Sequence, residues 1–275
     1  MYTAEFTYHK ASSVAEAIQM LQQNPDAKLL AGGHSLIPAM KLRLAQPPAL
    51  IDISKVAELK AIRLEGSTVV IGAAATYHEI ASNDQVKQAA PILADAIRHI
   101  GDPMVRHKGT LGGSLAHADP AADLPAAVLA LGAKMKIQGP GGSRMVDAAD
   151  FFQGMFATAV GQGEILTEIH VPANAGKQAY EKFPHPASRY PVVGVAVVVG
   201  ANGVQAALTG AGEHALRLTK LEQALAGKPL TAEAINAACQ GIVSPDQLMG
   251  DHNHSAEYRA HLVDVMAKKA LLRVM

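Results

Sequence analysis

The sequence predicts an α+β protein that ends in a small domain with a three-stranded antiparallel sheet and helices. Two observations carry this prediction. Near the start, strand-like and helical patterns alternate in the order strand, helix, strand, turn, strand, as in a small α+β unit. Beyond residue 177, strand patterns come first and helical patterns follow, which is typical of an antiparallel sheet with helices on one side.

Composition sets the broad class of the protein. The chain has 275 residues, enough for one large domain or two of ordinary size, and 49% of them are apolar. Lys plus Arg and Asp plus Glu number 24 each, so nothing in the charge indicates a nucleic-acid partner. The longest apolar run, Val192–Val199, is too short to cross a membrane, and the N-terminus does not read as a signal peptide. We expect a soluble, cytoplasmic protein.

The first subdomain is predicted over residues 1–55. Ser13 and Glu16 match a capping box, and Val14, Ala17, Ile18 and Leu21 then recur at helical spacing. The expected elements are a strand at Phe6–Tyr8, a helix that begins at Val14 and ends before Pro25, a strand at Ala27–Ala31, a helix at Leu36–Leu44 and a strand at Ala49–Ile53.

The second subdomain is predicted over residues 56–173. It begins with a hairpin pattern, and Pro91 is expected to kink or divide one of its helices. The expected elements are strands at Ala61–Leu64 and Thr68–Gly72, helices at Thr76–Ser82, Asp84–Ile100 and Leu124–Leu131, strands at Ala133–Gln138 and Arg144–Val146, a short helix from Asp150, and a strand at Glu164–Val171.

Residues 173–177 have the composition of a linker, so we place the domain boundary there and the second domain at residues 178–275. The expected elements after it are strands at Gln178–Phe183, Pro191–Gly200 and Val204–Leu208, followed by helices at Thr219–Ala226, Thr231–Gly241 and Ser255–Arg273.

Two loops with a glycine pair are the candidate binding motifs. Gly32-Gly33 follows an apolar strand pattern, and Gly112-Gly113 lies among hydroxyl and carboxylate side chains in the stretch Leu111–Pro125. Glycine lets backbone N–H groups approach a ligand, so the two loops could clamp a diphosphate from both sides. The alternatives are a plain strand-to-helix turn for the first loop and a helix cap at Asp123 for the second.

Other motifs are weaker. Gly210–Ala215 matches a dinucleotide fingerprint, but that fold needs a second strand where helical patterns follow here, so we expect a turn. The twelve histidines show no familiar zinc spacing, and we expect no metal site. The single cysteine, Cys239, excludes an intrachain disulfide and a cysteine-ligated cluster within this chain. No catalytic acid, base or nucleophile stands out.

The two loops in combination resemble the FAD-binding medium subunits of molybdenum hydroxylases, above all those of the carbon monoxide dehydrogenase type and the related xanthine dehydrogenase FAD subunits. Met40–Pro47 and His185–Tyr190 add to the resemblance, which covers essentially the whole chain. It implies a flavin domain of the vanillyl-alcohol-oxidase/para-cresol-methylhydroxylase (PCMH) type, split into two subdomains, and a C-terminal α+β domain. The rejection of the dinucleotide fingerprint agrees with this fold.

The resemblance also implies which residues bind the cofactor, FAD, which we expect to be held without a covalent bond. Asp123 would bind flavin-side hydroxyls or the ring edge, and Ala118 would lie beside the cofactor. Lys182 and Tyr190 would lie near the isoalloxazine, although on residue chemistry alone they read as an exposed strand lysine and a core-edge tyrosine. The diphosphate would contact Ala31, Gly32, Gly33, His34, Ser35 and Leu36 on one side and Thr110, Gly112, Gly113 and Ser114 on the other. Many relatives have Asn at the position of Ser114.

In such complexes a molybdopterin-binding large subunit oxidises the organic substrate, and a subunit with [2Fe–2S] clusters passes the electrons to FAD and so to an external acceptor. The resemblance therefore predicts an oxidoreductase flavoprotein subunit in a dimer of heterotrimers. Two alternatives remain open: a self-contained FAD-dependent oxidase or reductase, and a non-catalytic subunit that holds partners together.

Overall fold

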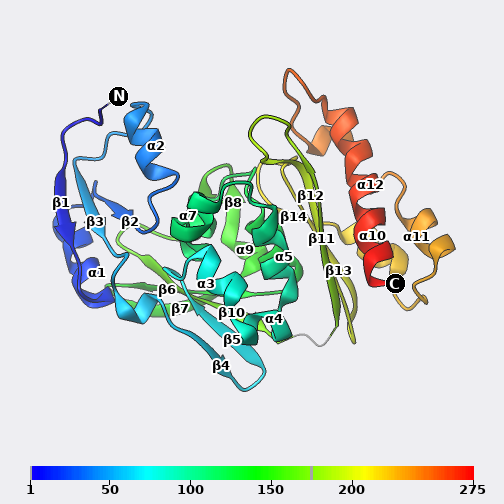
Figure 1. Ribbon diagram of the computed structural model, residues 1–275, viewed down its shortest axis with the longest axis horizontal. Coiled ribbons are helices and arrows are strands. Elements are labelled where there is room, and N and C mark those ends of the chain that lie inside the picture. Colours follow the sequence, from blue (N-terminus) through cyan, green and yellow to red (C-terminus); the bar gives the residue numbers. More distant parts are fainter. Residues whose placement is uncertain (1, 174–175) are drawn as a thin grey trace.

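Three main sheets divide the molecule into blocks along its long axis (Figure 1). The computed structural model describes residues 2–173 and 176–275. A three-stranded sheet lies in the N-terminal block, a five-stranded sheet in the middle block and a four-stranded sheet in the C-terminal block, with a two-stranded ribbon added to the middle block. Helices cover these sheets, so the predicted α+β class is confirmed.

The N-terminal block is a small parallel sheet in the order β1-β3-β2. Ser13 caps α1 as predicted and accepts a 3.1 Å hydrogen bond from the Glu16 N–H, while the Glu16 carboxylate accepts from the Ser12 N–H. The helix predicted to reach Leu44 ends earlier, at Lys41, and Arg43 adopts a left-handed φ of 61°. The elements are β1 (Thr7–Lys10), α1 (Val14–Gln23), β2 (Lys28–Leu30), α2 (Leu36–Lys41) and β3 (Ala49–Asp52).

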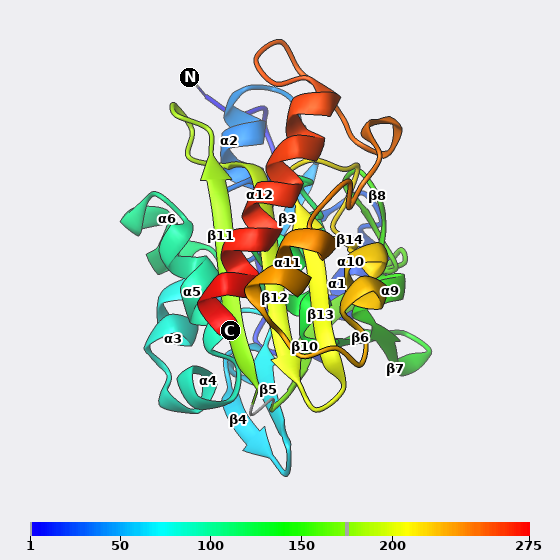
Figure 2. The same cartoon turned by 90° about the vertical axis from the view of Figure 1, so that its right-hand side faces the viewer.

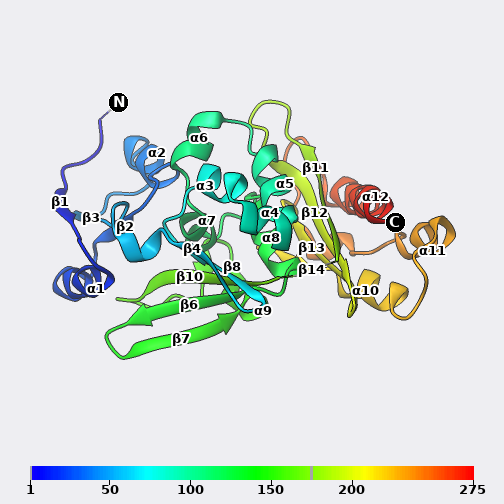
Figure 3. The ribbon, with the colours of Figure 1, turned by 60° about the horizontal axis from the view of Figure 1, so that its bottom comes forward.

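The middle block is an antiparallel sheet in the order β4-β5-β10-β6-β7 with helices packed over one face, as Figure 3 shows. Buried residues of its strands, among them Ile71 and Ile169, pack with the helices in one core. The elements are η1 (Ala57–Leu59), β4 (Ile62–Glu65), β5 (Thr68–Gly72), α3 (Tyr77–Ser82), α4 (Asp84–Ala89), α5 (Pro91–His99), α6 (Pro103–Lys108), α7 (Leu111–His117), α8 (Leu124–Ala130), β6 (Lys134–Gly139), β7 (Gly142–Asp147), α9 (Ala148–Phe151), β8 (Phe152–Gly154), β9 (Ala157–Thr158) and β10 (Ile165–Pro172).

The helices of the middle block match the sequence prediction at Pro91 and differ from it at the second glycine pair. Pro91 divides one predicted helix into α4 and α5, as its missing N–H dictates. The stretch expected to be a glycine loop instead begins with a helix, α7, whose N-cap is Thr110. Burial of Leu111 and Leu115 stabilises this helix despite the low helix propensity of its two glycines.

The C-terminal block is an antiparallel sheet in the order β11-β12-β13-β14. The sequence predicts three strands, and this is wrong by one, because β14 is only two residues long and carries no readable alternation. In Figure 2 the long helix α12 lies across β11 and β12. The elements are β11 (Lys177–Pro184), β12 (Pro191–Gly200), β13 (Gly203–Thr209), β14 (Leu216–Arg217), α10 (Thr219–Leu225), α11 (Ala232–Ala238), η2 (Pro245–Gln247) and α12 (Ala256–Val274).

The C-terminal sheet is covered on both faces, which explains why Val192–Val199 reads as one apolar run. Val195 and Val197 face the core shared with α10 and α12, and Ala196 and Val198 face the core shared with the middle block. The C-terminal block is thus joined to the middle block by a common core. Of the predicted linker 173–177, residues 174 and 175 lie outside the described residues, and the domain boundary there stays a prediction.

A buried ion pair crosses between these two blocks. Lys182 on β11 has a side chain only 2% exposed, and its Nζ lies 2.8 Å from Oδ1 of Asp123, at the start of α8. Burying two charges is favourable only when each finds its partner, so removing one leaves the other uncompensated.

We therefore expect Lys182→Met to lower the free energy of unfolding by about 3–5 kcal/mol. Urea unfolding of the apoprotein measures this loss. Lys87→Met is the control, because Lys87 pairs with Asp84 at 3.0 Å on the exposed surface and its loss should cost no more than about 1 kcal/mol. Equal effects of the two substitutions would contradict the structural role of the buried pair.

Candidate functional site

A cavity of about 1,020 Å³ lies where the three blocks meet. Its walls come from the segment after β2, the N-terminal end of α7, the segment before α8 and the loop between β11 and β12. All the predicted site residues line it except Ala118 and Lys182. The fold thus brings together two glycine pairs that are far apart in the sequence.

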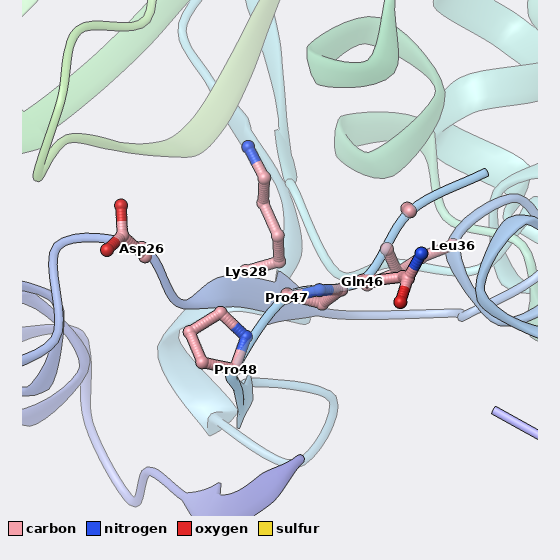
Figure 4. A pocket seen from close by; sticks show the side chains of 7 residues that line it. Asp26, Lys28, Leu36, Gln46, Pro47 and Pro48 are labelled. Atoms are coloured by element: carbon pink, nitrogen blue, oxygen red, sulfur yellow. The ribbon is translucent and has the colours of Figure 1, made fainter. Parts of the chain in front are cut away.

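A smaller hollow of about 460 Å³ adjoins the large cavity beside β2 (Figure 4). Both are lined by Lys28, Leu36 and Ala45. Its remaining lining residues are Asp26, Gln46, Pro47 and Pro48. It extends the side of the cavity formed by the N-terminal block.

The first glycine loop offers free backbone donors to the cavity. In the described part of the chain, the N–H groups from Ala31 to Leu36 donate no hydrogen bond to any other group. Gly33 has a φ of 74°, a conformation that suits glycine, and the His34 Nδ1–H donates to the Gly32 carbonyl at 3.0 Å. A run of unpaired N–H groups in irregular backbone is an anion-binding concavity.

Gly32 is required for packing and not for its backbone conformation. A Cβ at this position would lie 2.1 Å from the Lys108 carbonyl oxygen and 2.9 Å from Gly109 Cα. The first loop therefore packs directly against the backbone at the end of α6. Only glycine permits this approach, and the contact fixes the loop at the edge of the middle block.

The second glycine pair does not supply backbone donors, which corrects the sequence interpretation. The Gly112 N–H donates to the Ala73 carbonyl at 2.9 Å, and the Gly113 N–H donates to Thr110 Oγ1 at 3.1 Å. Gly112 also packs against Ala73, the residue that follows β5, since a Cβ at Gly112 would lie 2.4 Å from Ala73 Cβ. A Cβ at Gly113 would lie 2.7 Å from Thr110 Oγ1. This loop can therefore contribute the Thr110 hydroxyl, which accepts from Gly113 and keeps its own proton to donate.

Asp123 is the centre of a buried polar cluster at the cavity wall. The residue is 6% exposed, and its carboxylate accepts from the Tyr180 hydroxyl at 2.7 Å and from Lys182 Nζ at 2.8 and 3.1 Å. The ammonium of Lys182 also donates to the His99 carbonyl at 3.1 Å. Burial raises the pKa of Asp123, while Lys182 and the Tyr180 hydroxyl favour its charged form and oppose that rise.

The remaining predicted residues divide into two groups. Tyr190 is 49% exposed and lines the cavity, as does Ser114. Ala118 lies off the cavity wall: it is buried, ends α7 with a φ of 49° and accepts a hydrogen bond from the Phe156 N–H. Lys182 is likewise absent from the cavity lining. It is not an exposed strand lysine either, because its side chain is buried and pairs with Asp123.

Several lining residues were missed by sequence reasoning. They include Tyr77, whose pKa burial raises to about 12, and the segments Ile100–Asp102 and Phe156–Leu166. The last segment contains Gly161-Gln162-Gly163, and these two glycines are the signal that could have indicated a further loop at the site. The other residues have no pattern in the sequence that points to binding.

Comparison with known proteins identifies the family. Residues 4–174 match the FAD binding domain in molybdopterin dehydrogenase, and residues 178–274 match the CO dehydrogenase flavoprotein C-terminal domain. The carbon monoxide dehydrogenase medium chain of Hydrogenophaga pseudoflava is 42% identical, with 98% of this chain and 97% of that protein covered. The chain belongs to the FAD-binding medium subunits of molybdenum hydroxylases.

Two further similarities agree with this membership. The glyceraldehyde dehydrogenase medium chain of Sulfolobus acidocaldarius is 37% identical over the full length of both chains. Among solved structures, quinoline 2-oxidoreductase from Pseudomonas putida 86 superposes with a TM-score of 0.93 at 30% identity, with 100% of this chain and 98% of that chain covered. The medium subunit described here is thus an oxidoreductase component with FAD as its cofactor.

The cavity of this medium subunit fits FAD. The unpaired N–H groups of the first loop suit a diphosphate, and the positive φ of Gly33 gives the loop the backbone conformation that presents them. Asp123 lines the same cavity and offers a carboxylate to hydroxyl or N–H donors. No helix in the described ranges 2–173 and 176–275 has the length and apolarity that crossing a membrane requires. In those ranges no three His, Cys, Asp or Glu side chains gather in a way that could hold a metal ion.

We expect Gly33→Val to abolish FAD binding while the chain still folds. A valine side chain would strain the positive φ and would crowd Ile37 and Leu30, each 3.1 Å from the Cβ position, so the loop that carries the unpaired N–H groups would have to shift. Titration of the apoprotein with FAD, followed by flavin fluorescence, measures the loss.

Gly66→Val is the matched control for this substitution. Gly66 also has a positive φ, 57°, but it lies in the β4–β5 turn and its Cβ position is open. It carries the same kind of backbone strain far from the cavity, and it should keep wild-type FAD affinity. If Gly33→Val binds FAD as Gly66→Val does, the first loop is not the diphosphate site.

Proposed function

We propose that this chain holds FAD non-covalently in the cavity and passes electrons from a [2Fe–2S] partner subunit to an external acceptor. A molybdopterin-binding large subunit would oxidise the organic substrate. The observation that carries the proposal is the row of unpaired N–H groups from Ala31 to Leu36 on the wall of a cavity that all three blocks form. Bound FAD would supply the electron-carrying chemistry, and the chain would supply binding and orientation.

The residues of the cavity suggest a division of roles. The first loop would hold the diphosphate through its N–H groups, and the Thr110 hydroxyl would donate from the opposite wall. Asp123 would accept from the flavin-side half of the cofactor. Tyr190 lies on the wall contributed by the C-terminal block and would contact the ring. Lys182 would act through Asp123, to which it is paired.

The names of the relatives support electron transfer over a self-contained oxidase. Medium chains named for carbon monoxide and glyceraldehyde share this sequence, and a chain of quinoline 2-oxidoreductase shares this fold, each over at least 97% of its length. A chain that contained the substrate pocket would have to differ with the substrate, whereas one that carries electrons can stay the same. The single cysteine also requires that any cysteine-ligated [2Fe–2S] cluster belong to another chain.

The same proposal includes the domain limits of this chain and the complex in which it acts. We take the FAD-binding domain as residues 1–173 and the C-terminal domain as residues 178–275, which the matches at residues 4–174 and 178–274 support. A dimer of heterotrimers is the expected complex, formed by this chain with the iron–sulfur and molybdopterin subunits. The cytoplasmic location expected from the sequence stays a prediction.

Acid precipitation tests the non-covalent attachment of FAD. We expect all of the yellow colour to stay in the supernatant as FAD, because the chain binds through backbone donors and one carboxylate. Chromatography of the supernatant and absorbance of the pellet measure the two fractions. A yellow pellet would show a covalent bond, and His34 and His117, the histidines among the described lining residues, would be the positions to examine.

Anaerobic flavin reduction tests the electron-transfer role. The purified chain loaded with FAD is expected to stay oxidised when mixed with carbon monoxide, aldehydes, purines or N-heteroaromatic compounds. Addition of the iron–sulfur and molybdopterin subunits should make one of these substrates bleach the flavin absorbance. Rapid bleaching of the isolated chain would instead establish a self-contained oxidase or reductase, and a chain that never takes up FAD would be an assembly subunit.

A further inference from the structure

One face of the C-terminal sheet holds the part of the cavity wall that contains Asp123. Lys182 on β11 pairs in register with Gly194 on β12, and Gly194 pairs with Thr209 on β13. Tyr180 lies two residues before Lys182, so it shares this face. The face packs against the segment 119–123, which precedes α8.

The Tyr180 hydroxyl is fixed at Asp123 by its surroundings. Tyr180 is fully buried, and its hydroxyl lies 2.7 Å from Asp123 Oδ1. A Cβ at Gly194 would lie 2.3 Å from that hydroxyl oxygen, so glycine at this strand position leaves the space that the tyrosine occupies. The His99 and Tyr180 rings pack at nearly right angles, with their centroids 5.5 Å apart. These contacts hold the Tyr180 ring in one position, with its hydroxyl at Asp123.

Asp123 has a single acceptor position left for a ligand. A carboxylate offers about four lone-pair positions, two on each oxygen. Oδ1 accepts from Tyr180 and from Lys182, and Oδ2 accepts from Lys182. One position therefore remains, on Oδ2, and Asp123 lines the cavity. The cluster presents a carboxylate that is oriented and charge-paired, with capacity for one more donor.

Thr209 fixes the backbone that carries Asp123. Its hydroxyl lies 2.6 Å from the Ala122 carbonyl oxygen and 3.0 Å from that of Pro120, so its one proton is shared between them. The Gly210 N–H donates to the Pro120 carbonyl at 2.8 Å. Thr209 is fully buried. These bonds join the end of β13 to the residues immediately before Asp123.

We propose that Tyr180 and Thr209 are positioning residues for the bound flavin nucleotide. Tyr180 orients the Asp123 carboxylate, and Thr209 holds the segment before it, so that Oδ2 accepts one hydrogen bond from a hydroxyl or N–H group on the flavin side of FAD. This inference rests on the proposed FAD site. It gives the C-terminal domain a role in cofactor binding through residues that do not line the cavity.

The charged and titratable groups around Asp123 determine how binding depends on pH. Lys182 faces it from β11 and His99 from α5, and both favour the charged carboxylate. Tyr77 on α3 and Tyr190 also interact with its charge. Burial raises the pKa of Asp123, and the Tyr180 hydroxyl lowers it. If the charged carboxylate accepts from FAD, affinity falls as the pH drops through the pKa of Asp123.

Tyr180→Phe tests the role of the hydroxyl, with the FAD dissociation constant measured from pH 5 to pH 8. We expect affinity to fall roughly tenfold at neutral pH, because an Asp123 carboxylate that Tyr180 no longer orients would lose its hydrogen bond from FAD. The pH at which affinity is lost should also move upward, because Tyr180 no longer favours the charged carboxylate. Tyr8→Phe is the matched control, since Tyr8 donates to Asp52 at 2.6 Å in the N-terminal sheet, outside the cavity lining.

Thr209→Val provides a second test, and Thr209→Ser, which keeps the hydroxyl, should restore FAD binding. This pair decides the matter if Tyr180→Phe does not fold. For Thr209→Val we expect weaker FAD binding with the pH dependence of the wild type, since Thr209 does not touch the Asp123 carboxylate. Thr167→Val is its control, because the buried Thr167 hydroxyl donates to the Lys136 carbonyl at 3.1 Å in the middle sheet. Thermal melting of the apoproteins checks that each variant folds.

The outcomes separate this inference from the function on which it rests. A wild-type chain that binds no FAD overturns both. A wild-type chain that binds FAD, with Tyr180→Phe and Thr209→Val indistinguishable from their controls, overturns the positioning role alone. Weaker binding in Tyr180→Phe with an unchanged pH profile also overturns it, because a merely structural loss would do the same. The upward shift in pH together with the Thr209→Val loss establishes it.

Discussion

The contact on which the cofactor cavity most depends is the buried pair of Asp123 and Lys182. Asp123 lies at the start of α8 in the FAD-binding half, and Lys182 lies on the first strand of the C-terminal sheet. A buried charge without a partner is strongly unfavourable, so each half of the chain is stable in this arrangement only with the other in place. The pair thus fixes the position of the C-terminal block relative to the cavity.

The two walls of the cavity differ in how they meet a ligand. The first loop presents backbone donors that no group in the described chain uses, whereas the corresponding donors of the second loop are bound to Ala73 and Thr110. The wall formed by the first loop therefore has unpaired N–H groups that suit an anion. The wall formed by the second loop has its N–H groups paired and contributes only packing surface and side chains. Asp123 adds a carboxylate to the lining of the same cavity.

A medium subunit of this kind has little need for acid–base residues of its own. Two titratable residues that line the cavity, Asp123 and His34, are committed to structure: Lys182 and Tyr180 donate to Asp123, and His34 donates to the Gly32 carbonyl. Such commitments make the cavity rigid, which favours a fixed cofactor orientation over proton exchange with a substrate. This agrees with a family whose members keep one fold beside partners that act on different compounds.

The sequence alone determined the α+β class, the capped first helix, the division at Pro91 and the two glycine motifs, because these depend on local periodicity, caps and backbone freedom. Tertiary structure decided the rest. α7 forms because burial of Leu111 and Leu115 overrides the propensity of Gly112 and Gly113, and β14 exists only as a partner of β13. The pairing of Lys182 with Asp123 joins residues that are far apart in the chain. No local pattern encodes such a pairing, since only the folded core removes both charges from water.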